Sequence, residues 1–106
     1  MRGLFDQGTP VPLRTHLSSH RIETAFERGW NTLKIGEILA VAEQEGFDVF
    51  VTTDKNLRHQ LNPGRRRIAI IVLSSTSWPR SQKAAAAIER AIDIALPGSI
   101  KEVVIP

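Results

Sequence analysis

Two apolar runs in the second half of the chain restrict its fold more than any other feature. "DVFVTT" spans residues 48–53 and "IAIIVL" spans residues 68–73, and the centre of each run contains no polar residue. Successive side chains of a strand point to opposite faces of the sheet, so a strand with one exposed face alternates apolar and polar residues. A continuously apolar strand is instead buried on both faces, as in parallel sheets that helices cover. The two runs therefore predict an α/β fold.

The rest of the chain alternates predicted strands and helices in a way that fits this fold. We expect one domain over residues 1–106, with a mostly parallel sheet of four to five strands flanked by helices. A 2-1-3-4 strand order would make the first and third strands neighbours. The expected strands are residues 2–6, 20–24, 48–53, 68–73 and, at an edge, 100–105. The first expected helix covers residues 9–17, with Thr9 as its N-cap. The second runs from residue 31 or 32 to residue 45 and is ended by Gly46, and a short one covers 55–61. The last begins at Pro79 and carries an apolar stripe of Ile88, Ala91, Ile92 and Ala95.

The composition excludes several kinds of site. The chain has 106 residues and no cysteine, which excludes disulfides, zinc–thiolate sites and thiol nucleophiles. No apolar run approaches the roughly 20 residues that span a bilayer. The N-terminus reaches Asp6 and Pro10 too early for a signal peptide. We therefore expect a cytoplasmic protein without a membrane partner.

The chain is basic, with a formal net charge of +3 and a pI of about 10.0. This balance weakly favours a polyanionic partner such as RNA. One interpretation of the local excess is a patch that contacts phosphates, and an equally good one is a solvated loop. The residues concerned are Lys55, Arg58, Arg65, Arg66 and Arg67.

Three acidic residues are the best candidates for chemistry. Asp6 follows the first predicted strand and Asp54 follows the third. If these strands are neighbours, both carboxylates project into one crevice, because ligands of open parallel sheets collect at the carboxyl ends of the strands. Glu37 has Leu33, Ala40 and Val41 as its helical neighbours, so we expect it in apolar surroundings.

Acids brought together in this way repel one another unless a cation joins them. Hard oxygen ligands suit Mg²⁺ or Mn²⁺, so Asp6, Glu37 and Asp54 are predicted metal ligands. A simpler interpretation stays open for each residue. Asp6 is also a suitable cap for the helix that follows it, with "DxxTP" as a turn signature, and Asp54 is a suitable N-cap. Glu37 near a helix start is favoured by the helix dipole even when exposed.

Several segments resemble a known family. "LFDQGTPVPLRTHL", "TAFERGW", "GEILAVAEQEGFDVFVTTDKNL" and "RRIAIIVL" look like the short bacterial PIN-like domain family, which is related to VapC-type toxin ribonucleases. The similarity runs in the same order from about Leu4 to Trp78. Its most specific parts are "LFD", the helix "GE" and "VTTD" with an asparagine two residues on.

The resemblance implies a three-layer PIN-like sandwich that binds Mg²⁺ or Mn²⁺ through acids and hydrolyses RNA phosphodiester bonds. It makes Asp6, Glu37, Asp54 and Asn56 the expected catalytic set, with Asn56 at a position where many PIN-type proteins carry a further acid. It also implies the toxin of a type II toxin–antitoxin pair, with RNA as substrate, a cognate antitoxin as partner and a homodimer as an assembly to test.

Two other functions remain in competition. A PIN-like scaffold without catalysis would bind RNA or protein, and the amide of Asn56, which lowers the negative charge of the site, favours this alternative. A receiver-like phospho-acceptor domain also clusters acids at strand ends, but the acid pair expected after its first strand is reduced to Asp6.

Overall fold

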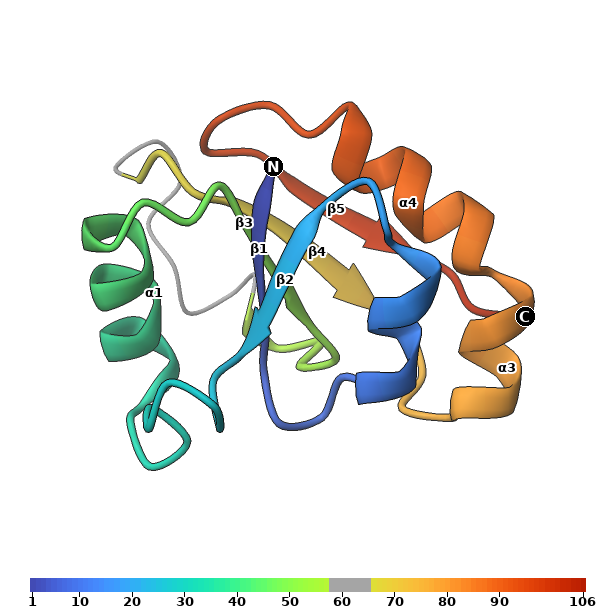
Figure 1. Ribbon diagram of the computed structural model, residues 1–106, viewed down its shortest axis with the longest axis horizontal. Coiled ribbons are helices and arrows are strands. Elements are labelled where there is room, and N and C mark those ends of the chain that lie inside the picture. The colour runs from blue at the N-terminus through green and yellow to red at the C-terminus, as the bar shows by residue number, and fades with distance from the viewer. Residues whose placement is uncertain (58–65) are drawn as a thin grey trace.

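The computed structural model describes residues 1–57 and 66–106 of the chain. All five strands are parallel and form one sheet (Figure 1). They are β1 (Arg2–Phe5), β2 (Arg21–Thr24), β3 (Val49–Thr52), β4 (Ala69–Leu73) and β5 (Ile100–Val103). The predicted α/β fold with a parallel sheet is confirmed.

The strand order is β2-β1-β3-β4-β5, so the chain begins inside the sheet and extends it on both sides. The order contains the 2-1-3-4 arrangement that makes the first and third strands neighbours, and β5 adds a fifth strand at the expected edge. The register places Phe5 of β1 opposite Val51 of β3. The ends of β1 and β3 therefore lie at the same level of the sheet.

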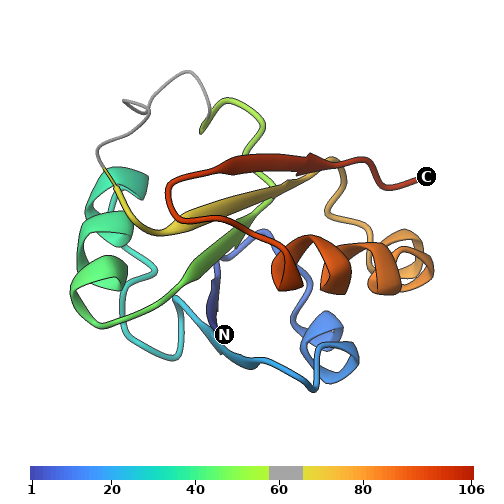
Figure 2. The ribbon, with the colours of Figure 1, turned by 90° about the horizontal axis from the view of Figure 1, so that it is seen from above.

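Helices cover both faces of the sheet, as Figure 2 shows from above. The 3₁₀ helix η1 (Val11–His16) packs on one face with α3 (Trp78–Lys83) and α4 (Ala85–Asp93), and α1 (Ile35–Gln44) packs on the other. Every residue of β3 and β4 is buried. The two continuous apolar runs thus have the burial on both faces that they predicted, and each face has its own apolar cluster.

Three predicted boundaries are wrong. The second expected helix begins at Ile35, because residues 31–33 form a turn in which the Leu33 N–H bonds to the Trp30 carbonyl. The last helix is two helices that meet at Ala84. Thr9 is not the N-cap of η1, because Pro10 holds that position.

Other expected boundaries are confirmed or lie partly outside the described residues. Gly46 has a φ of 84° directly after α1, as expected of a helix-ending glycine. Lys55 and Asn56 form a turn, and residues 58–61 of the expected short helix lie outside the described residues. Within ranges 1–57 and 66–106, no helix has the length and apolarity to cross a bilayer.

Candidate functional site

The candidate site lies at the edge where the strands end, between β1 and β3. The chain leaves β1 for η1 on one face of the sheet and reaches β3 from α1 on the other face. Such a change of face is a topological switch point, where open parallel sheets bind their ligands. Asp6 directly follows β1, and Asp54 lies two residues after the end of β3. The expectation that their strands are neighbours is confirmed.

Two buried threonines orient the carboxylate of Asp6. Its Oδ1 accepts a hydrogen bond from the Thr9 N–H at 3.1 Å and lies 2.7 Å from the Thr9 hydroxyl. Its Oδ2 accepts a hydrogen bond from the Thr52 hydroxyl. Thr9 is 2% exposed and Thr52 is fully buried, whereas Asp6 is half-buried. Hydrogen bonds to two buried side chains therefore fix the carboxylate at the edge where the strands end, where it stays partly exposed.

The hydroxyl of Thr52 also connects the two strand-end acids. It donates its proton to Asp6 and accepts a hydrogen bond from the Asp54 N–H at 3.1 Å. A single buried side chain thus bonds to the first acid and to the backbone of the second. The double threonine before Asp54 is a sequence signal for this arrangement, and sequence analysis missed the role of Thr52.

Asp54 starts the turn that follows β3. Its Oδ1 accepts a hydrogen bond from the Asn56 N–H at 3.0 Å, and its carbonyl accepts one from the Leu57 N–H at 3.2 Å. Leu57 is fully buried, so it fixes the far end of the turn in the core. Asn56 is exposed, and its backbone orients Asp54. Asp6 and Asp54 thus each accept a hydrogen bond from an N–H group of the turn that follows. The cap expected of Asp6 on the following helix is wrong, because Pro10 is the N-cap of η1.

Glu37 is exposed, so the expectation of apolar surroundings is wrong. Its neighbours on the helix surface are Ala40, which is exposed, and Val41, which is half-buried, while the buried residues of α1 face another side. Glu37 Oε1 accepts a hydrogen bond from the Lys34 N–H at 3.0 Å. It therefore satisfies one of the free N–H groups at the start of α1.

The three predicted acids do not form one cluster. Among the described residues, no three His, Asp or Glu side chains lie close enough together to hold a metal ion. Asp6 and Asp54 remain as the pair at the strand ends.

The predicted basic contacts are divided between the two ends of the sheet. Lys55 is exposed in the turn beside Asp54. Arg66 and Arg67 precede β4 and lie at the edge where the strands begin, away from the acids. The Arg67 N–H donates to Glu43 Oε1, and the Arg67 carbonyl accepts from the Gly98 N–H at 2.9 Å. Arg58 and Arg65 lie outside the described residues.

Two clefts border Asp6 on opposite sides. The larger has a volume of about 440 Å³ and lies between η1 and the turn after β2, where its lining includes Gln7, Val11, Arg14, Phe26 and Glu27. The smaller has a volume of about 150 Å³ and lies against the start of α1, where its lining includes Gln7, Gly8, Asn31, Ile35 and Ile38. Asp6 is thus accessible from both faces of the sheet.

The larger cleft contains an ion pair that sequence analysis missed. Arg14 Nη1 donates to Glu27 Oε1 at 2.7 Å, and the Thr24 N–H donates to the same oxygen at 2.9 Å. These two bonds hold the pKa of Glu27 below its usual value of 4.5. Thr24 and Glu27 form an S/T-x-x-E capping box, which was visible in the sequence as "TAFE".

Comparison with protein-family models, with curated proteins and with solved structures finds no match to this chain. The resemblance to the PIN-like family therefore stays a prediction from the sequence. The fold itself, a parallel sheet between two helical layers, is consistent with a PIN-like sandwich.

Proposed function

We propose that the protein is a metal-dependent ribonuclease of the PIN-like type. One observation carries this proposal: Asp6 and Asp54 follow adjacent parallel strands at the switch point, and the Thr52 hydroxyl bonds both to the Asp6 carboxylate and to the Asp54 N–H. This is where open parallel sheets bind ligands. Both acids are partly exposed at an edge that two clefts approach.

The residues present suit a hard divalent cation. Mg²⁺ is commonly held by one or two carboxylates and keeps several of its waters, so Asp6 and Asp54 form an adequate donor set for Mg²⁺ or Mn²⁺. When bound, such an ion polarises a phosphate and lowers the pKa of a coordinated water. Thr9 and Thr52 orient Asp6, and the Asn56 N–H orients Asp54. Lys55 is available to contact the RNA backbone at the same edge.

The test is cleavage of structured RNA in the presence of Mg²⁺ or Mn²⁺. We expect Asp6→Asn and Asp54→Asn each to lower the cleavage rate by at least about a hundredfold, because each removes a charged metal ligand. Glu102→Gln removes an equal charge from an exposed position on β5 and should cleave like the wild type. Equal rates in all four proteins would refute the assigned site.

A second candidate function is a non-catalytic module that binds RNA or protein. The observation that favours it is the absence of a cluster of three acids in the described chain, together with the turn-forming hydrogen bonds of Asp6 and Asp54. Titration calorimetry separates the two candidates. No heat with millimolar Mg²⁺ or Mn²⁺ favours the binding module, whereas binding that Asp54→Asn abolishes favours the nuclease.

The toxin role and the antitoxin partner rest on the sequence resemblance alone. We expect induced expression of the chain to arrest bacterial growth, and Asp6→Asn to relieve the arrest. A small reading frame directly upstream whose co-expression restores growth would identify the antitoxin. Analytical ultracentrifugation of the purified chain tests the homodimer.

A further inference from the structure

Phe26 is an exposed aromatic residue in a turn that does not need it. The side chain is 71% exposed. On either side of it, the Thr24 N–H donates to Glu27 Oε1 at 2.9 Å and the Glu27 N–H donates to the Thr24 hydroxyl at 3.0 Å. These reciprocal bonds close the turn through other residues, so the ring of Phe26 adds nothing to its closure. Val11, which is 47% exposed, lines the same cleft, so exposed apolar side chains gather there among polar ones, as they do in ligand-binding grooves.

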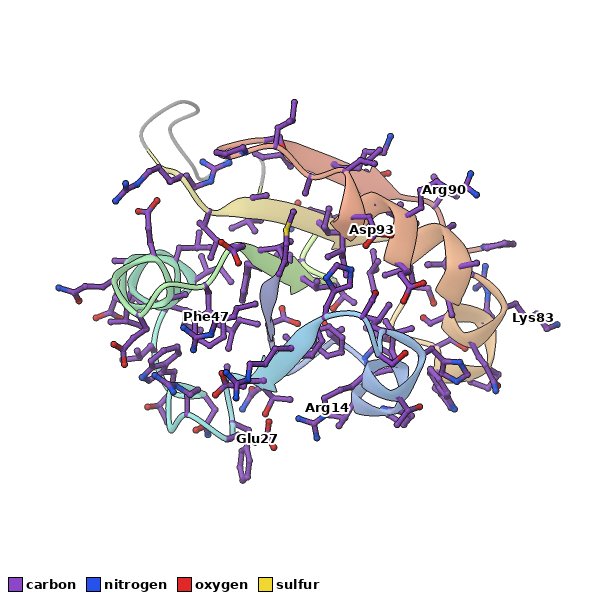
Figure 3. All side chains as sticks on the ribbon, turned by 45° about the horizontal axis from the view of Figure 1, so that its top comes forward. Arg14, Glu27, Phe47, Lys83, Arg90 and Asp93 are labelled. Carbon is purple, nitrogen blue, oxygen red and sulfur yellow. The ribbon has the colours of Figure 1, made fainter. Side chains whose placement is uncertain are left out.

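Beside Phe26, polar groups of both signs line the larger cleft. Arg14 from η1 and Glu27 from the turn after β2 lie together on one side of the molecule (Figure 3). Gln7 adds an exposed amide, and Asp6 forms the wall toward the strand ends. The cleft therefore offers an apolar ring, carboxylate acceptors and guanidinium and amide donors within one space.

This combination suits a nucleobase better than a phosphate. Two carboxylates, Asp6 and Glu27, face one guanidinium, so the local charge opposes a phosphate. The edge of a base is neutral and carries both donors and acceptors, and its flat face stacks on aromatic side chains. The volume of about 440 Å³ lies within the range of pockets that hold small organic ligands.

We propose that the cleft between η1 and the turn after β2 binds one unpaired base of an RNA chain. Phe26 is the stacking surface, and Gln7, Arg14 and Glu27 contact the edge of the base. The proposal rests on the proposed ribonuclease function, because Asp6 belongs both to this cleft and to the pair of strand-end acids. A base held here places the adjoining backbone at the edge where cleavage is proposed.

Fluorescence anisotropy with a labelled single-stranded oligoribonucleotide of about ten nucleotides tests the proposal. The measurement is made in EDTA, so binding is recorded without metal and without cleavage. We expect Phe26→Ala to weaken binding by about five- to a hundredfold, the usual effect of removing one stacking side chain. Phe26→Tyr keeps a ring and should bind within about threefold of the wild type.

Two controls distinguish base stacking from other causes. Leu96→Ala removes an apolar side chain that is 69% exposed at a distant position after α4, and it should bind like the wild type. An abasic sugar–phosphate chain of equal length should bind the wild type and Phe26→Ala equally, because it has no base to stack.

Unchanged RNA affinity in Phe26→Ala would overturn the proposal. The cleft would then be a candidate site for a side chain of a partner protein. An equal loss of affinity for the abasic chain would overturn it as well, because Phe26 would then act on the backbone or on the fold. The proposed nuclease fails separately: if Asp6→Asn and Asp54→Asn cleave normally, the metal site is wrong while the effect of Phe26 on metal-free binding still stands.

Discussion

Beside the start of β1, Arg2 and Arg28 are paired with acids, whereas Asp6 at the other end of the strand takes part in none of the ion pairs of the described chain. Glu23 lies 3.2 Å from Arg2 and 3.4 Å from Arg28, and Glu45 lies 2.6 Å from Arg28. We call these four residues the arginine network. Its charges neutralise one another, while the bonds of Asp6 come from neutral donors.

The arginine network has a structural role that its surroundings make clear. Arg2 lies 4.4 Å from the ring centre of Phe47, and its Nη1 donates to the Glu45 carbonyl at the end of α1 at 2.6 Å. Cations stabilise helix C-termini and aromatic faces. The network thus joins β1 and β2 to α1. The carboxylate of Asp6 instead bonds to the neutral side chains of Thr9 and Thr52, and no ion pair of the described residues includes it.

Removing one acid from each region tests this difference and gives the largest expected effect. Asp6→Asn should lower RNA cleavage by at least about a hundredfold and lower the unfolding free energy by about 1 kcal/mol, because the amide accepts hydrogen bonds at only one of the two oxygen positions that Thr9 and Thr52 use. Glu23→Gln should leave cleavage unchanged and lower the unfolding free energy by about 1 kcal/mol. Cleavage assays give the RNA cleavage rates of the two variants, and urea unfolding gives their unfolding free energies.

The comparison fails if the two variants behave alike. A loss of cleavage in Glu23→Gln that matches Asp6→Asn would mean that the arginine network also contributes to the site. A loss of stability in Asp6→Asn with full cleavage would make Asp6 a turn residue only.

Thr52 gives the next largest effect, because it connects the two acids. Thr52→Val keeps the shape and removes the hydroxyl that donates to Asp6 and accepts from the Asp54 N–H. We expect cleavage to fall by about ten- to a hundredfold, as for other residues that orient metal ligands. The unfolding free energy should fall by about 1–2 kcal/mol, because a buried hydrogen-bonding group is lost.

Thr15→Val is the matched control for Thr52→Val. The Thr15 hydroxyl is exposed on η1 and donates to the Pro12 carbonyl at 3.0 Å. This variant should change neither cleavage nor Mg²⁺ affinity. If Thr52→Val also keeps wild-type Mg²⁺ affinity, Thr52 supports the strand end without orienting a ligand.

The sequence was sufficient to predict the sheet and the two strand-end acids. Apolar runs identify strands buried on both faces, and parallel strand ends meet at one edge. The same rule places Arg66 and Arg67 at the opposite edge, because they precede a strand. Because these arginines are close to Lys55 in sequence, one basic patch was expected. In a parallel sheet, however, residues that precede a strand and residues that follow one lie at opposite edges.

Other features carry too little signal in the sequence. Ala40 beside Glu37 suggested an apolar face, yet alanine is small and occurs on exposed helix surfaces without loss. The break at Ala84 lies beside a run of alanines with equal helix propensity, so no residue marks it. The bond of Thr52 to Asp6 joins two segments that are 46 residues apart in the sequence, and only the folded chain shows it.

Arg28→Met tests the structural role of the arginine network and should have a moderate effect on stability. It keeps the apolar stem of the side chain and removes the charge that pairs with Glu23 and Glu45. We expect the unfolding free energy to fall by about 1 kcal/mol and cleavage to stay unchanged. Arg21→Met is the control, because Arg21 is exposed on the same strand as Glu23 and belongs to none of the ion pairs of the described chain. Equal stability of both variants would contradict the structural role.

The ion pair in the cleft gives the smallest effect, and pH reveals it. The hydrogen bonds from Arg14 and from the Thr24 N–H hold the pKa of Glu27 below 4.5 in the folded chain. A depressed pKa means that the folded state favours the charged form, so Glu27 adds stability above the unfolded pKa and loses it as pH falls through the folded value. The melting temperatures of the wild type and of Glu27→Gln should therefore differ near pH 6, and the difference should shrink as the pH falls below 4.5. Subtracting one variant from the other removes the titration of the remaining acids. A difference that stays constant over this range would show that Glu27 acts through the shape of the turn, and not through its charge.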